Sequence, residues 1–328
     1  MLFLPPRRGK EDAAAWPARR DRGEASTKRG ITPSLQRAQD RLSILPLNGE
    51  EECHESCPLA ALAAAVLAVA GVIIRQVGVL DRYFIFFPER EVAETPSDRG
   101  LAFEDVSFTA SDGTRLHGWY VHGTSDVTWL WFHGNAGNIA DWLDALAALH
   151  RNLGVAIFIF DYRGYGKSEG RPSERGMYVD GEAALVYLRS RPDVNADKVV
   201  LYGRSLGCAV AVEMASRHGA YALVLESPFT SIRAMARQTL PVLPAWLLVK
   251  SRFVSLSKMC GITAPLLVVH PENDEVVPIA MGWEVHEAAG GPRRFFVAEG
   301  ALHNDQHLAG GDPYFAALRD FLASVGEG

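Results

Sequence analysis

The chain has 328 residues, of which 48% are hydrophobic and 22% charged, enough apolar sequence for one large or two small folded domains. Lys and Arg number 33 against 39 Asp and Glu, so the net charge of −6 provides no basic surface for nucleic acid, and we expect no such partner. The four cysteines are too few for a disulfide framework. Cys53 and Cys57 lack zinc-ribbon spacing and a convincing fourth ligand, so we expect no metal and no other cofactor.

Residues 1–57 differ in composition from the rest of the chain. They contain ten basic and nine acidic residues, with Pro, Ser and Gly between them and no sustained apolar periodicity. This pattern predicts a disordered tail, and a misassigned start codon is the alternative interpretation.

A long apolar segment follows the tail. Residues 59–74 carry no polar side chain, and as a helix residues 59–80 would reach about 33 Å, enough to cross a hydrocarbon core of roughly 30 Å. We therefore predict a transmembrane or membrane-anchor helix over residues 58–80, which makes the protein single-pass, with the side of its large domain undecided. A buried Ala-rich helix is the alternative. The aromatic stretch 83–87 predicts a membrane interface, within a linker over residues 81–99.

Alternating strand and helix patterns begin after residue 100. The expected strands, mostly short apolar runs, cover residues 103–110, 115–122, 127–132, 155–160, 198–202, 222–225, 266–270 and 293–298. Helical patterns cover residues 138–150, 173–190, 206–218, 278–289 and 312–325. The alternation predicts an α/β domain over residues 100–328, with a mostly parallel central sheet flanked by helices.

A serine stands where one of these strands passes into a helix. Gly203, Ser205 and Gly207 form a G-x-S-x-G pattern directly after the strand at 198–202. In this pattern the serine occupies a strained turn, and the small residues beside it let neighbouring elements approach closely. We predict that Ser205 is a nucleophile. An ordinary glycine-rich turn is the alternative.

A nucleophilic serine needs a base and an orienting carboxylate, because its free hydroxyl is weakly nucleophilic at neutral pH. Asp274 and His303 stand in polar loops after the last two expected strands, where open α/β sheets place their sites. The chain order Ser, Asp, His is a known order for such triads. The other candidate acids are Glu226, Glu272, Glu275 and Asp305.

Four sequence blocks together resemble a known superfamily. They are residues 133–138 (HGNAGN), residues 161–168 (DYRGYGKS), the Ser205 turn, and the loops that carry Asp274 and His303. With the N-terminal apolar segment, residues 100–325 resemble membrane-anchored serine hydrolases of the α/β-hydrolase superfamily, near its serine-aminopeptidase and acyl-thioesterase-like branch.

The resemblance implies the α/β-hydrolase fold with an N-terminal hydrophobic helix. It also implies an oxyanion hole formed by the backbone N–H groups of Asn135 and Leu206. Pro271 departs from the pattern, because relatives often carry Gly before the acid.

We expect a serine hydrolase that cleaves ester, thioester or related acyl bonds through an acyl-enzyme. A short apolar cap over residues 228–262 would suit an acyl chain, so the expected partner is a small-molecule, lipid-like or acyl-protein substrate. The alternatives are a serine peptidase acting on short peptides and a catalytically silent α/β-hydrolase that serves as a binding module.

Four further residues near the motifs have other expected roles. His133 is expected to be a structural histidine of the oxyanion loop, and Cys208 a small buried residue rather than a second nucleophile. His307, four residues after His303, lacks the third ligand that a metal pair needs. Arg204 is either structural or close to a substrate carboxylate, and the sequence does not decide between the two.

Overall fold

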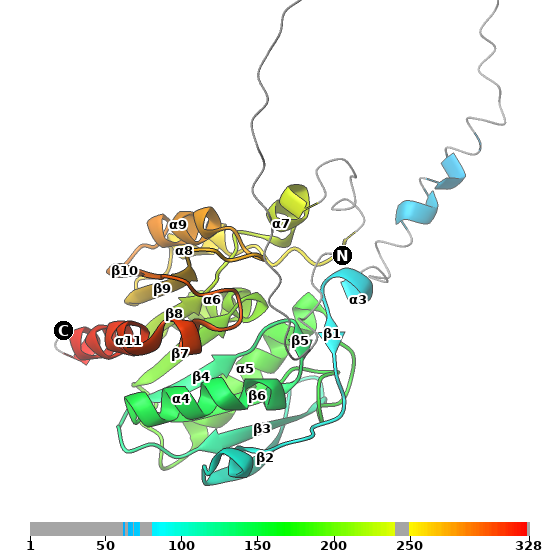
Figure 1. Cartoon of the computed structure of the whole chain (residues 1–328). Coiled ribbons are helices and arrows are strands. Elements are labelled where there is room, and N and C mark those ends of the chain that lie inside the picture. The colour runs from blue at the N-terminus through cyan, green and yellow to red at the C-terminus, as the bar shows by residue number, and fades with distance from the viewer. Residues whose placement is uncertain (1–61, 63–64, 68, 73–80, 240–248, 327–328) are drawn as a thin grey trace, which may run out of the picture. The chain divides into compact units, whose positions relative to one another are not determined.

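An eight-stranded sheet forms the centre of the computed structural model, which describes residues 62, 65–67, 69–72, 81–239 and 249–326. The strands are β2 (Phe103–Thr109), β3 (Arg115–Val121), β4 (Thr128–Phe132), β6 (Ala156–Asp161), β7 (Val199–Arg204), β8 (Ala222–Glu226), β9 (Leu266–Pro271) and β10 (Arg293–Ala298). Their order is β10-β9-β8-β7-β4-β6-β3-β2 (Figure 1). β3 runs antiparallel to β2 and β6, and the remaining pairs are parallel.

Helices cover both faces of the sheet. α4 (Leu143–Leu153) and α11 (Gly311–Gly326) pack on one face (Figure 1). α5 (Glu174–Ser190), α6 (Leu206–His218) and α9 (Ile279–Glu287) pack on the other. In β4, Trp129 and Trp131 pack on the side of α4 and α11, and Leu130 and Phe132 pack on the side of α5, α6 and α9. All four side chains are fully buried. Strands buried on both faces explain the continuous apolar runs, and the predicted α/β architecture is confirmed.

Residues 81–99, expected to form a linker, carry short elements of their own. These are α3 (Asp81–Phe84), β1 (Phe87–Pro88) and the 3₁₀ helix η1 (Pro96–Arg99). β1 pairs in parallel with β5 (Ala136–Gly137). Ile85 and Phe86 are only 2% and 1% exposed, so the structure places them in the domain core and not at a membrane interface. Burial of apolar side chains favours this arrangement.

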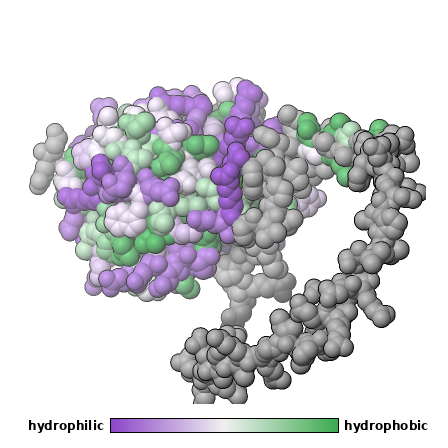
Figure 2. All heavy atoms as spheres, turned by 90° about the horizontal axis from the view of Figure 1, so that it is seen from above, coloured by the Kyte–Doolittle hydropathy of each residue, from purple (hydrophilic) through white to green (hydrophobic). Residues whose placement is uncertain are grey.

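The predicted membrane segment lies mostly outside the described residues, as do residues 1–57. Its described residues, 62, 65–67 and 69–72, are helical, and apolar side chains among them, such as Leu62 and Leu67, are exposed. Within the described ranges, no helix combines the length and apolar character needed to cross a bilayer. On the face of the molecule seen in Figure 2, hydrophilic and hydrophobic residues are intermixed over the coloured surface.

The predicted cap region contains α7 (Ile232–Thr239) and α8 (Leu256–Met259), and residues 240–248 fall outside the described part. The buried Asp81 carboxylate accepts the backbone N–H groups of Lys250 and Ser251 at 2.9 and 3.0 Å. The segment after the apolar stretch is thus tied at Asp81 to the later part of the cap region.

Two short helices complete the elements. They are the 3₁₀ helix η2 (Ile139–Trp142) before α4 and α10 (Gln306–Ala309) before α11.

Candidate active site

Ser205 occupies the sharp turn between β7 and α6. Its backbone has φ 50° and ψ −117°, a conformation that residues with a side chain rarely adopt. The backbone N–H of Ser205 donates to the carbonyl of Glu226 at 2.9 Å and fixes the turn against β8. A Cβ on Gly203 would lie 2.7 Å from the Cα of Cys208, and one on Gly207 would lie 1.9 Å from the carbonyl oxygen of Phe132. The glycines of the motif are therefore required by packing.

His303 lies in the loop after β10 and faces the serine. Its Nε2 is 3.1 Å from Ser205 Oγ, and its Nδ1 is 2.9 Å from both carboxylate oxygens of Asp274. A carboxylate only accepts hydrogen bonds, so Nδ1 carries the proton and Nε2 is the acceptor that faces the hydroxyl. This is the arrangement in which an imidazole can take a proton from serine.

Asp274 lies in the loop after β9, and its side chain is fully buried. The carboxylate accepts the backbone N–H groups of Val276 and Val277 at 2.9 and 2.7 Å. Burial raises the pKa of Asp274, but the hydrogen bond and charge of His303, with the Val277 N–H, outweigh burial, so the pKa ends below its usual value. The carboxylate is therefore ionised at neutral pH and oriented toward the imidazole.

The other candidate acids have different positions. Glu275 accepts the backbone N–H of His303 at 3.0 Å, and Asp305 accepts a backbone N–H of its own loop at 2.6 Å. Glu226 is fully buried and accepts a tyrosine hydroxyl, whereas Glu272 is exposed. Within the described chain, none of these four carboxylates is hydrogen-bonded to the imidazole.

The HGNAGN loop lies beside Ser205 at the end of β4. The Asn135 carbonyl accepts the Tyr165 hydroxyl at 2.8 Å and the Phe87 N–H at 3.0 Å, and its side-chain amide donates to the carbonyl of Ile85 at 3.0 Å. These contacts fix the side chain of Asn135 and the peptide group that its carbonyl belongs to. The backbone N–H of Asn135 has no acceptor among the described residues. That of Leu206, at the start of α6, likewise has none, as is usual for the first N–H groups of a helix.

Two supporting residues, His270 and Ser227, gave no signal in the sequence. His270 donates from Nε2 to the Val277 carbonyl at 2.8 Å and so holds the loop of Asp274. Burial lowers the pKa of His270 against the opposing effects of Val277 and Asp274, which keeps the ring neutral. Ser227, at φ 51°, also lowers the pKa of Asp274 and accepts the Gln306 amide at 2.9 Å. A backbone with positive φ leaves no sequence signal unless the residue is Gly, Asn or Asp.

The structure also places Arg204, Cys208, His133 and His307. Arg204 is 1% exposed and therefore cannot contact a substrate. Cys208 is fully buried, and burial raises the pKa of its thiol well above the usual value, so the thiol is protonated. His133 is also fully buried and donates from Nδ1 to the Gly134 carbonyl at 2.8 Å. His307 cannot pair with His303 on a metal while His303 contacts the serine and the aspartate.

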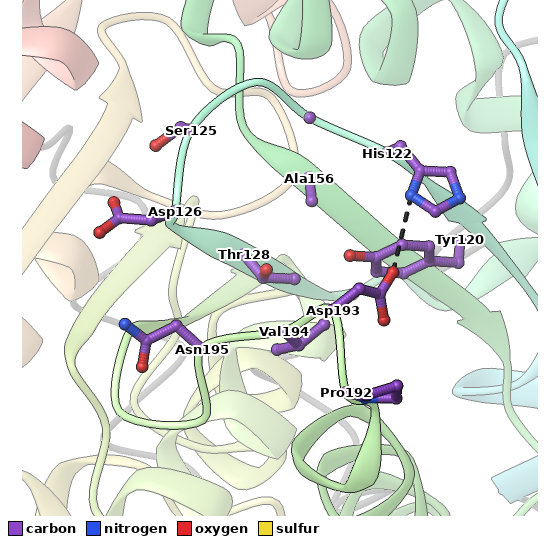
Figure 3. Close-up of a pocket in the computed structure, with 11 residues that line it drawn as sticks. Tyr120, His122, Ser125, Asp126, Thr128, Ala156, Pro192, Asp193, Val194 and Asn195 are labelled. Atoms are coloured by element: carbon purple, nitrogen blue, oxygen red, sulfur yellow. Dashed lines mark ion pairs between the residues drawn. The ribbon is translucent and has the colours of Figure 1, made fainter.

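A hollow of about 490 Å³ lies at the opposite edge of the sheet, where β4 and β6 begin (Figure 3). His122 and Asp193 line it, and with Glu104 they form the one metal-ligand group of three found in the described ranges. Arg191 is already hydrogen-bonded to both carboxylates, at 2.7 to 2.9 Å. A cation would have to displace this guanidinium, so the cluster is an ion-pair network.

Relatives place the chain in a family. A model of the alpha/beta hydrolase fold matches residues 130–249. The alpha/beta hydrolase domain-containing protein WAV2 of Arabidopsis thaliana is 34% identical over 250 residues, which cover 70% of this chain and 81% of the relative. The chain belongs to the alpha/beta hydrolase family. This alpha/beta hydrolase is also 36% identical, over 272 residues, to the uncharacterized protein Rv2307c of Mycobacterium tuberculosis, which covers 82% of this chain and 96% of that relative.

Solved structures share the fold. An esterase of Pyrococcus furiosus, PF2001, superposes with a TM-score of 0.61 and 22% identity over 73% of this chain and 98% of the esterase. At this identity the likeness concerns the fold alone. The function of this alpha/beta hydrolase has to be argued from its own residues.

Proposed function

We propose that this alpha/beta hydrolase is a serine hydrolase that cleaves carboxylic ester, thioester or related acyl bonds. One observation carries the proposal: Asp274, His303 and Ser205 form a continuous hydrogen-bonded chain, 2.9 and 3.1 Å long at its two links, with the serine on a strained turn. Ser205 is the nucleophile, His303 the general base and acid, and Asp274 the residue that fixes the imidazole tautomer.

The reaction follows from these positions. Ser205 Oγ attacks the carbonyl carbon while His303 Nε2 takes the hydroxyl proton, which gives a tetrahedral oxyanion. Its collapse breaks the bond to the leaving alcohol, thiol or amine, and the imidazolium protonates that group. Water then attacks the acyl-enzyme with His303 again as base, and collapse of the second intermediate releases the carboxylic acid and restores Ser205.

Two backbone donors are available for the oxyanion. The N–H of Leu206 belongs to the positive end of α6, and the N–H of Asn135 belongs to a residue whose own carbonyl is already engaged. We propose that these two groups form the oxyanion hole, in which each donor stabilises the transition state by about 3 kcal/mol. Fixed donors of this kind need no reorganisation during the reaction.

For the substrate we propose an acyl group carried by a small molecule, a lipid or a protein. Phe229, Ile232 and Met235 of the cap region are apolar and pack into the domain core, which supports an apolar environment around the cap. Anchoring of residues 59–80 in a membrane, as in the serine-aminopeptidase and acyl-thioesterase-like branch, is part of the same proposal. The exposed apolar side chains of the described helical residues, such as Leu67 at 73%, support it. Carbonate extraction of membranes that hold the full chain tests the anchoring: release by carbonate would contradict it.

Covalent labelling tests the proposed nucleophile. A fluorophosphonate should label the wild-type protein, and Ser205→Ala should abolish the labelling. Ser216→Ala is the matched control, because its hydroxyl lies on α6 and donates to a backbone carbonyl away from the site. Labelling that persists in Ser205→Ala, or that is absent from the wild type, contradicts the proposal.

A substrate panel tests the bond type. The panel contains p-nitrophenyl esters of increasing chain length, acyl-CoA thioesters and aminoacyl amides. We expect turnover of the esters or thioesters, and turnover confined to the amides would favour a peptidase. Complete absence of turnover with normal folding would favour a silent binding module.

A further inference from the structure

A buried arginine precedes the proposed nucleophile. Arg204 is the last residue of β7, and its side chain is 1% exposed. An arginine cannot lose its charge at any ordinary pH, and a buried charge is costly unless the fold pairs it. Because the side chain is out of reach of a substrate, its contacts must serve the protein itself.

The first contact of Arg204 is a buried carboxylate. Arg204 is in register with Glu226 on the neighbouring parallel strand β8, and its Nη1 lies 3.5 Å from Glu226 Oε2. The Tyr314 hydroxyl, from α11, donates to the other carboxylate oxygen of Glu226. The same Glu226 accepts the backbone N–H of Ser205 through its carbonyl. The ion pair is therefore built into the strands that position the serine.

The second contact reaches the loop of the proposed base. Arg204 Nη2 donates to the backbone carbonyl of His303 at 3.1 Å, across 99 positions of sequence. On the opposite side of that residue, the His303 N–H donates to Glu275. The peptide groups on both sides of the imidazole are thus fixed by charged side chains, and the bond from Arg204 is the one that ties the loop to the serine strand.

The third contact reaches the proposed oxyanion loop. The guanidinium carbon of Arg204 lies 4.8 Å above the ring of Trp142, the last residue of η2. This distance is typical of a cation–π contact. A Cβ on Gly134 would lie 3.4 Å from the same ring, which shows how closely Trp142 approaches the loop. The guanidinium of Arg204 therefore contacts both the His303 backbone and Trp142, which lies against the oxyanion loop. Arg204 itself directly precedes the proposed nucleophile in sequence.

We infer that Arg204 is a positioning residue that holds the imidazole of His303 and the Asn135 loop in register with Ser205, with Glu226 and Tyr314 orienting the guanidinium. The inference rests on the proposed function. Displacement of a reacting group by about 1 Å can cost roughly 100-fold in rate, so loss of this anchor should lower kcat. KM should stay within about twofold, because the side chain does not touch substrate.

Chemical rescue tests the inference. In Arg204→Ala we expect the fluorophosphonate labelling rate and kcat to fall by about 10- to 100-fold. Guanidinium chloride at non-denaturing concentration should raise the labelling rate and kcat of Arg204→Ala at least several-fold, because the cation can occupy the space beside Glu226 and Trp142. Urea has the same shape but no charge, and it should not raise them. NaCl at the same ionic strength should not raise them either. Wild-type protein with the same additives is the control for general salt effects.

The results separate the inference from the function on which it rests. An unlabelled wild type contradicts the proposed function. A labelled wild type with an equally fast Arg204→Ala, or with equal rescue by urea and guanidinium, overturns the inference alone. So does a raised KM with unchanged kcat. If Arg204→Ala does not fold, Arg204→Lys tests the inference. A single ammonium cannot contact both Glu226 and the His303 carbonyl as the two-pronged guanidinium does, so kcat should still fall. A wild-type kcat in Arg204→Lys overturns the inference.

Discussion

The two edges of the sheet carry polar clusters of opposite kinds. At the carboxyl ends of the parallel strands (the carboxyl edge), Ser205 and His303 are 7% and 5% exposed, and Ser205 Oγ lies 3.1 Å from His303 Nε2. At the amino edge, His122 is 53% exposed and Asp193 38%, and they border a hollow of about 490 Å³. This hollow lies away from the hydrogen-bonded chain.

The two clusters therefore differ in their exposure to water. Charged pairs in contact with water are screened and contribute little to stability. The same groups in a dry, fixed arrangement exert a strong electrostatic effect on a neighbouring atom. The carboxyl edge gains this environment because the loops after β7, β9 and β10 converge there. We therefore expect equal substitutions at the two edges to have very different effects.

The largest expected difference compares two aspartates. Asp274→Asn should lower kcat by about 10³- to 10⁴-fold, because an amide does not hold the imidazole in the tautomer that accepts the serine proton. Asp193→Asn, at the amino edge, should leave kcat within about twofold. Steady-state hydrolysis of a p-nitrophenyl ester measures both. Similar losses in the two variants would remove the distinction between the edges.

The next expected effect concerns packing beneath the serine. Gly207→Ala should lower the free energy of unfolding by about 3 kcal/mol or more, because the new Cβ would lie 1.9 Å from the Phe132 carbonyl oxygen. Gly261→Ala is the control, since its Cβ would meet only the Lys258 carbonyl, at 3.7 Å. It should change stability by less than about 1 kcal/mol. Denaturant unfolding compares them, and a tolerated Gly207→Ala would show that the turn can move.

A smaller effect should appear as a pH dependence of stability. Burial lowers the pKa of His307 to about 4, the charge of Arg204 adds to this, and Asp144 and Asp305 oppose it. Between pH 6.5 and 4 the unfolded chain binds a proton that the folded protein does not, so stability falls as the pH falls through this range.

After allowance for solvent screening of this partly exposed side chain, the contribution of His307 is about 1 to 2 kcal/mol. Replacement by glutamine removes the titrating group, so the slope of unfolding free energy against pH should become shallower in His307→Gln. Urea unfolding at constant ionic strength from pH 7 to 4.5 measures it. An unchanged slope would assign the acid sensitivity to other groups.

The smallest effect is expected at the rim of the amino-edge hollow. Asp126 and Lys198 form an ion pair at 2.6 Å, with side chains 62% and 37% exposed. Asp126→Asn should change the free energy of unfolding by less than about 0.5 kcal/mol, because water and salt screen such pairs. A loss above 1 kcal/mol in urea unfolding would show that this edge is more rigid than its exposure indicates.

Local patterns were sufficient for the fold. The strand β4 was predicted from an apolar run because a strand covered on both faces needs one, whatever its neighbours are. The turn at Ser205 was predicted from two glycines, whose small size is a requirement of the turn itself. By contrast, Ile85 and Phe86 were expected at a membrane surface, and their burial depends on β1 reaching β5, a contact between distant segments.

The sequence by itself determined the class of fold, its α/β alternation, and the three side chains that the structure brings together at Ser205. Only the tertiary structure decided that Asp274 and not Glu226 meets the imidazole, and that Arg204 turns inward to Glu226 and the His303 carbonyl. The reason is that residue type and spacing reflect local backbone requirements. A contact across 99 positions depends instead on the order of the strands and on which face each side chain occupies.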